Sequence, residues 1–173
     1  MFNGSKIKLA VSTGLAVAGL GIASLASVSA SAANTGNTTG NVAVSQTITL
    51  SGLTSAFTLT GAPGATATGV SAATMNVKTN DKAGYTVTVQ AAAANMVGTA
   101  GNADVIPVSS LTVKNSGGVY TALSSSASVT TASTAVKTTG LGDTVNNDYQ
   151  ITNIPWVNAD TYSVTLNYVA TGN

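Results

Sequence analysis

The chain has 173 residues, of which 44% are hydrophobic and only 6% are charged, with a formal net charge of +1. It contains no cysteine, histidine, glutamate or arginine, which excludes the usual zinc sites and the Ser-His and Cys-His nucleophile systems. We therefore expect a protein that is not an enzyme and needs no cofactor.

The first 32 residues have the pattern of a secretory signal peptide. Lys6 and Lys8 precede an uncharged stretch rich in Gly and Ala, and small residues follow at 30–33. This order of charged, apolar and small residues is typical of a cleavable signal. A retained membrane anchor is the alternative, because about 20 apolar residues can span a bilayer. Cleavage is predicted after Ala32, with Ala30 and Ala33 as the next choices.

Residues 33–41 form a polar lead rich in Asn, Thr and Gly, and residues 42–173 are predicted to form a single domain. After the signal peptide the chain contains four lysines and five aspartates, so its net charge is about −1. No basic patch remains for nucleic acid, and none for an anionic membrane surface after cleavage. The absence of cysteine in an exported protein is compatible with a Gram-positive envelope.

Apolar residues alternate with Thr, Ser and Asn in most of the remaining chain, which predicts strands with one buried face. Polar and Gly-rich segments punctuate these runs: residues 80–84 are predicted to form a hairpin loop, and residues 115–118 divide two further strands. Ala91–Met96 is a candidate helical turn. The strands are predicted over residues 41–50, 55–60, 74–79, 85–90 and 162–168.

This pattern predicts an all-β fold: an antiparallel, two-sheet, Ig-like sandwich of about seven to nine strands. An up-and-down barrel is the alternative. Charged residues are far below the ~25% that is usual in soluble domains. Such a surface lacks the charges that discourage edge-to-edge pairing of strands, and this favours ordered assembly.

Two candidate sites follow from the residue types. Asp143, Asn146, Asn147 and Asp148 are oxygen ligands in a predicted loop, so they are a weak calcium candidate, although Asp and Asn are also ordinary turn residues. Trp156, next to Pro155, is expected to plug the core at one end of the sandwich. Its alternative role is an exposed aromatic platform for a sugar or a partner, together with Tyr149, Tyr162 and Tyr168.

Residues 79–89 (Thr-Asn-Asp-Lys-Ala-Gly-Tyr-Thr-Val-Thr-Val) resemble the turn-and-strand segment of WxL-type cell-wall domains, and residues 159–168 resemble their closing strand. The same ending is similar to the last strand of spore-coat-U-like and pilin-type proteins. The tryptophan motif here reads Trp156-Val157-Asn158, and Tyr168 stands where a second tryptophan is expected. The resemblance implies an exported β-sandwich displayed at a bacterial surface.

The leading hypothesis is a secreted structural protein of the cell surface or extracellular matrix. Its expected partners are a cell-wall polymer or other surface proteins, including copies of itself. A filament subunit that inserts residues 34–50 into the sheet of the next subunit is one alternative. A carbohydrate-binding module centred on Trp156 and the three tyrosines is the other.

Overall fold

The computed structural model describes residues 35–115 and 117–173. The predicted signal peptide, with its cleavage positions Ala32 and Ala33, lies outside these residues. Residues 35–41 are exposed and have no regular structure, and Val42–Asn173 form one compact unit.

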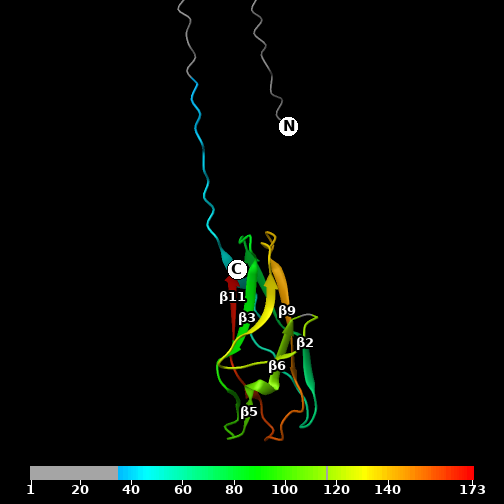
Figure 1. Ribbon diagram of the computed structural model, residues 1–173. Coiled ribbons are helices and arrows are strands. Elements are labelled where there is room, and N and C mark those ends of the chain that lie inside the picture. The colour runs from blue at the N-terminus through cyan, green and yellow to red at the C-terminus, as the bar shows by residue number, and fades with distance from the viewer. Residues whose placement is uncertain (1–34, 116) are drawn as a thin grey trace, which may run out of the picture. The chain divides into compact units, whose positions relative to one another are not determined.

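The described residues of this unit form an antiparallel all-β fold, as predicted (Figure 1). Eleven strands make three sheets, where seven to nine strands in two sheets were expected. The surplus comes from strands of two or three residues, too short to show a periodicity in sequence. The main sheet has the order β1-β2-β9-β6-β7, the second sheet β11-β3-β8 and the small sheet β10-β4-β5.

The bounds of the elements follow the alternating runs closely for the long strands. The strands are β1 (Ile48–Ser51), β2 (Ala67–Thr79), β3 (Tyr85–Ala91), β4 (Asn95–Gly98), β5 (Val105–Pro107), β6 (Leu111–Asn115), β7 (Thr121–Ala122), β8 (Val129–Thr134), β9 (Asp143–Ile151), β10 (Tyr162–Ser163) and β11 (Leu166–Gly172). A single 3-10 turn, η1 (Val108–Ser110), precedes β6.

The core consists of two hydrophobic clusters that draw side chains from more than one sheet. One cluster joins Met75 and Val77 of β2 and Val145 of β9 to Tyr85 and Val87 of β3. The larger cluster contains residues of all three sheets, including Val89, Ile106, Val113, Tyr149 and Ile151. In β3 every second residue is buried, so the period of two predicted from the sequence selects the core-facing side chains.

The predicted hairpin at residues 80–84 is a connection between sheets instead. It joins β2 to β3, but β2 pairs with β1 and β9, whereas β3 pairs with β11 and β8. Gly84 has φ +86°, and a Cβ atom there would overlap the backbone carbonyl of Thr134. The turn chemistry was read correctly from the sequence, but turn residues do not determine which strand is the hydrogen-bonding partner. Residues 115–118 were predicted to divide two strands; by contrast with residues 80–84, the strands on either side, β6 and β7, do pair.

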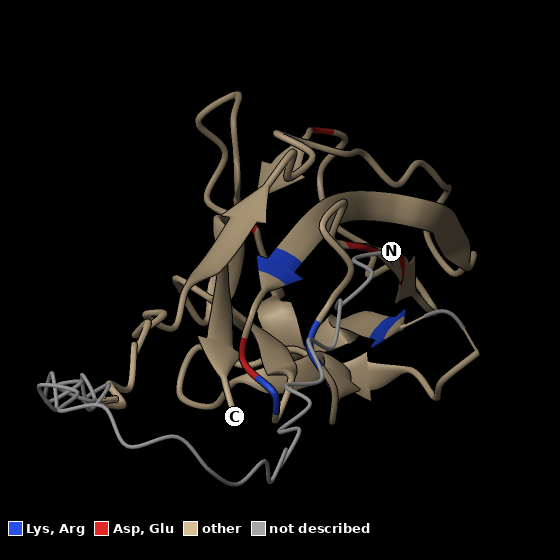
Figure 2. Ribbon diagram, turned by 90° about the horizontal axis from the view of Figure 1, so that it is seen from above, with Lys and Arg blue, Asp and Glu red and all other residues tan. Residues whose placement is uncertain are grey.

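One further local prediction was wrong, and another was confirmed only in part. Residues 92–94 form a bend that leads into β4, so Ala91–Met96 is not a helical turn. Of the strand predicted over 41–50, only Ile48–Leu50 pairs, within β1. Val42 and Val44 are 90% and 80% exposed. The charged residues of the described domain are few and scattered (Figure 2).

Candidate functional site

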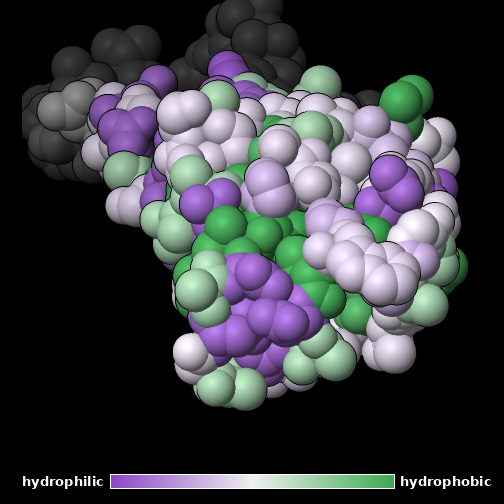
Figure 3. Space-filling view, turned by 90° about the horizontal axis from the view of Figure 1, so that it is seen from below, coloured by the Kyte–Doolittle hydropathy of each residue, from purple (hydrophilic) through white to green (hydrophobic). Residues whose placement is uncertain are grey.

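An apolar groove of about 760 Å³ opens at the end of the domain that carries β5 and β10. One wall is the chain after β1, residues 53–61, and the other is residues 158–166, around β10. Met96, Leu111 and Ile151 lie between them. Figure 3, which looks onto this end, shows hydrophobic residues in a hollow beside a hydrophilic knob. The volume is within the ~300–1,000 Å³ typical of binding sites.

The first wall is extended but has no partner strand among the residues that the structure describes. Thr54 still donates its backbone N–H to the Thr74 carbonyl, at 3.0 Å. From Ser55 to Gly61, no backbone N–H donates to another residue within the described chain. Side chains nevertheless alternate, with Phe57 and Leu59 half-buried between exposed neighbours. The strand predicted over 55–60 therefore has the expected alternation without the expected pairing.

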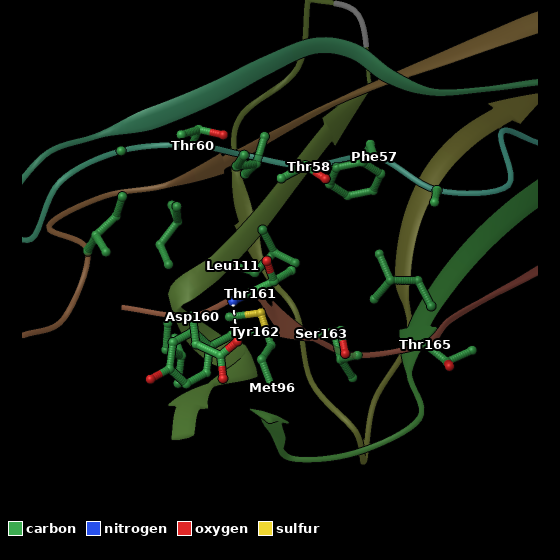
Figure 4. Close-up of a pocket in the computed structure, with 18 of the residues that line it drawn as sticks. Phe57, Thr58, Thr60, Met96, Leu111, Asp160, Thr161, Tyr162, Ser163 and Thr165 are labelled. Atoms are coloured by element: carbon green, nitrogen blue, oxygen red, sulfur yellow. Dashed lines mark hydrogen bonds between the residues drawn. The ribbon is translucent and has the colours of Figure 1, made fainter. Parts of the chain in front are cut away.

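The second wall belongs to the two edge strands β10 and β11. Each is the last strand of its sheet, so it pairs on one side only: β10 with β4 and β11 with β3. The turn between them is held from the same side, because Ala92 donates to the Thr165 carbonyl at 2.9 Å. Figure 4 shows residues 160–165 across the pocket from Phe57 and Thr60. The groove therefore separates two extended segments.

Aromatic side chains connect the groove to the core, because Phe57 and Tyr168 line the groove and pack against the cluster that contains Tyr149. The rings of Phe57 and Tyr149 lie 4.4 Å apart, and the hydroxyls of Tyr149 and Tyr168 share a hydrogen bond of 2.5 Å. Burial is the main cause of raised pKa values in both tyrosines, and that of Tyr168 is raised to about 12. Both phenols therefore stay protonated at neutral pH and act as structural groups.

Asp160 fixes the outer end of the second wall. Its carboxylate accepts the backbone N–H of Ala100 at 2.9 Å and that of Thr161 at 2.7 Å, and the Thr99 hydroxyl at 3.1 Å. The hydrogen bond from Ala100 is the main reason why the pKa of Asp160 lies below its usual value. Because its oxygens are occupied by donors, this carboxylate anchors the loop against β4.

Trp156 lies outside the core, contrary to the expectation that it seals one end. It is 92% exposed in the loop before β10. Its neighbours Ile154 and Val157 are half-buried and pack on the larger cluster. Ile154 is held by backbone hydrogen bonds with Gly64 and Ala65, and Val157 donates to the Pro155 carbonyl at 3.1 Å. These contacts turn the intervening indole toward solvent.

The three tyrosines do not form a platform with Trp156. Tyr149 is fully buried, Tyr168 is bonded to it, and Tyr162 donates its hydroxyl hydrogen to the Asn158 carbonyl at 2.9 Å. Tyr162 and Tyr168 line the groove, as does Val157. The sequence-predicted aromatic site thus divides into one buried tyrosine, Tyr149, two half-buried tyrosines that line the groove, and one exposed indole.

The predicted calcium loop is part of strand β9. Neighbouring side chains of a strand point to opposite faces, and accordingly Asn147 is buried, whereas Asn146 and Asp148 are on the other face. Asp148 pairs with Lys114 at 3.5 Å and accepts the Ser71 N–H at 2.7 Å. The four residues, Asp143 included, do not converge on one point. Within residues 35–115 and 117–173, no group of three acidic residues is placed to hold a metal ion.

Comparison with known proteins adds no family to this description. No protein-family model matches the chain, and no curated protein matches it significantly. In the part of the chain that the structure describes, no helix is long and apolar enough to cross a membrane.

The groove was missed by the sequence analysis, although both of its walls were singled out. Residues 55–60 and 162–168 were each predicted as strands from their alternation. Alternation identifies the inward-facing side chains but not the distance to the next strand. The only local signal was the position of Pro63 and Pro155 beside the walls, since proline lacks the N–H that a central strand needs.

Proposed function

We propose that this protein is an exported, non-catalytic structural protein of a bacterial cell surface or extracellular matrix. Residues 1–32 are its signal peptide, and the domain that follows is an Ig-like β-sandwich with a small additional sheet. It is retained through non-covalent contact with a cell-wall polymer, another surface protein or copies of itself. The resemblance of residues 79–89 and 159–168 to bacterial surface domains is consistent with this role.

The observation that carries the proposal is the open apolar groove between an extended segment, residues 55–61, that has no partner strand in the described chain and the edge strands β10 and β11. Exposed apolar surface of this kind marks interaction sites in stable proteins. The chain lacks histidine, cysteine and glutamate, and the tyrosines in the groove have raised pKa values. The groove therefore offers shape, apolar area and backbone hydrogen bonds, which serve binding.

The test is the fate of the native protein in a bacterial host that exports it. We expect the chain to lose its first 32 residues and to occur in the wall fraction or in extracellular assemblies. Mass spectrometry of the N-terminus, fractionation and electron microscopy measure this. Release by detergent or denaturant, without wall hydrolysis, is expected for non-covalent retention. A freely secreted monomer that neither binds purified walls nor assembles would refute the proposal.

The exposure of Trp156 favours a second candidate, glycan binding by one exposed aromatic. An indole that is 92% exposed can stack on the apolar face of a sugar ring. Binding of the domain to purified cell wall should then be lost in Trp156→Ala with the fold intact, since this side chain adds little to the core. Equal binding by Trp156→Ala would exclude this role.

A further inference from the structure

We propose that the groove takes a strand from a second copy of this chain, namely residues 38–44. This inference rests on the proposed function and names the contact through which copies assemble. It depends on three features of the described residues: the chemistry of the groove walls, the exposed valines ahead of β1, and the short reach of these valines within their own domain.

The walls of the groove favour a polypeptide strand over a lipid or another apolar ligand. A lipid chain needs only apolar area, which Met96, Leu111 and Ile151 supply. Residues 55–61, however, also present a row of backbone N–H and carbonyl groups without partners in the described chain. The edge strands β10 and β11 flank the opposite side. An inserted strand satisfies such backbone groups and fills the apolar floor with alternate side chains.

Residues 38–44 have the properties that this site requires. They have no regular structure and are exposed. Val42 and Val44, at 90% and 80% exposure, share one face of an extended chain with Thr38 and Gly40. The segment carries no charge, so its insertion buries none. In the monomer these two exposed valines lower solubility and add nothing to the core.

The groove of the same copy is out of reach for these valines. The Asn80 side chain donates a hydrogen bond to the Ser45 carbonyl at 2.8 Å, and its amide oxygen accepts the Thr47 N–H at 2.7 Å. These bonds hold residues 45–47 beside the turn after β2. The wall begins near Thr54, which is hydrogen-bonded to Thr74. Thr74 is six residues before Asn80, so an extended strand separates the two by about 20 Å. Val42 is three residues from Ser45 and reaches about 10 Å.

A second copy can supply the strand without this restriction. The donor segment and the acceptor groove are different surfaces at the two ends of β1, so the contact is heterologous. Contacts of this type repeat from copy to copy and produce open filaments unless the rotation closes a ring. In the assembly that we propose, each subunit keeps its structure except that residues 38–44 become a strand in the neighbour.

Engineered disulfides test the contact directly, because the chain has no native cysteine. The full exported chain is prepared as Ala43→Cys and as Thr58→Cys, a residue of the first wall (Figure 4). Ala43 alternates with the two valines and Thr58 with Phe57 and Leu59, so both cysteines lie on the outward face of the paired segments. After mixing and mild oxidation we expect mixed dimers of these two variants. The control replaces Thr58→Cys by Thr144→Cys, on an exposed position of β9. Equal yields of mixed dimer in both mixtures would overturn the inference.

A charge substitution tests whether the contact drives assembly. The double variant Val42→Asp/Val44→Asp should reduce the assembled fraction at least about tenfold, because two buried valines are replaced by carboxylates. The control Val119→Asp/Leu141→Asp makes the same change at two other exposed apolar positions and should leave assembly intact. Circular dichroism should show both variants folded.

The outcomes separate this inference from the proposed function. If the parent assembles and the donor double variant assembles equally well, the donor strand is wrong and the structural role stands. If the parent is retained on the wall as a monomer, the donor strand is likewise wrong and the structural role stands. A lipid recovered from the groove of the purified parent would also overturn the inference. A parent that neither assembles nor binds the wall refutes the structural role as well.

Discussion

The two ends of the domain use the same pair of chain segments in opposite ways. At the closed end, β1 pairs with β2 and contacts β11, and the cluster of Val77, Tyr85 and Val87 beneath them is almost fully buried. At the groove end, the chain after β1 and the chain before β11 are extended but separate, and the core is open between them. One end completes a core, and the other leaves an apolar groove.

This comparison shows that alternation and pairing are separate properties of a β-strand. Phe57 and Leu59 at the groove end alternate with Thr residues just as Tyr85 and Val87 do at the closed end. Only the latter lie in a strand with a neighbour on each side. Alternation decides which side chains face inward, whereas a hydrogen-bonded neighbour at about 4.8 Å depends on the rest of the fold.

The largest expected difference between the two ends is the cost of removing a core side chain. Met75 at the closed end is 2% exposed, so Met75→Ala should lower the free energy of unfolding by about 2–5 kcal/mol. Leu59→Ala, on the groove wall, should cost less than about 2 kcal/mol, because its side chain is only partly removed from water. Urea denaturation of the monomer measures both values. Equal costs would contradict the division into a closed and an open end.

Two glycines of left-handed conformation give the second comparison. Gly84, between β2 and β3, has φ +86°, and an added Cβ would overlap the Thr134 carbonyl. Gly64, near the groove, has φ +81°, and no atom lies within 4 Å of the position of such a Cβ. Gly64→Ala should therefore cost about 1–2 kcal/mol from conformation alone. Gly84→Ala adds overpacking, for a total of about 2–4 kcal/mol.

Thermal or urea unfolding of the two glycine variants provides the measurement. The difference between them isolates the close approach of β3 and β8 at the closed end, because both positions share the same unfavourable backbone conformation. If Gly64→Ala proved as costly as Gly84→Ala, the groove end would be as tightly packed as the closed end.

The parts of the fold that the sequence predicts are those controlled by neighbouring residues. The alternation in β3 and the all-β class follow from side-chain chemistry within a short window. The turn at residues 80–84 was also evident, but whether it joins strands of one sheet or two depends on packing partners far along the chain. The runs at 55–60 and 162–168 indicated strands for the same local reason, and the groove between them could not be inferred.

The candidate site shows the same limit. Trp156 was expected in the core because its size favours burial. Its direction follows instead from the backbone hydrogen bonds that Ile154 makes with Gly64 and Ala65 and from the one that Val157 donates to Pro155. Asp143 and Asn147 were assigned to a loop because both residue types favour turns, although they continue a strand of nine residues. Residue types show which side-chain groups the chain lacks, whereas the groove depends on contacts between segments that are far apart in the sequence.

The smallest expected effect concerns Tyr168, which packs against both clusters and so connects the two ends. Its pKa is raised from 10.0 to about 12, mainly by burial. Below pH 10 the phenol is protonated in the folded and unfolded states, and its contribution to stability is fully present. As the pH rises from 10 to about 12, the unfolded chain loses this proton first, so the free energy of unfolding should fall gradually over this range.

Urea denaturation between pH 8 and pH 12 on Tyr168→Phe and on a control, Tyr120→Phe, tests this link. Tyr168→Phe should cost about 1 kcal/mol at pH 7, because the Tyr149 hydroxyl loses its partner, but its alkaline decline should be shallower than that of the parent. Tyr120→Phe should follow the parent. An unchanged decline in Tyr168→Phe would mean that its phenol is already open to water through the groove. The hydrogen-bonded pair of Tyr149 and Tyr168 would then belong to the open end of the domain, and the dry core would not extend to the floor of the groove.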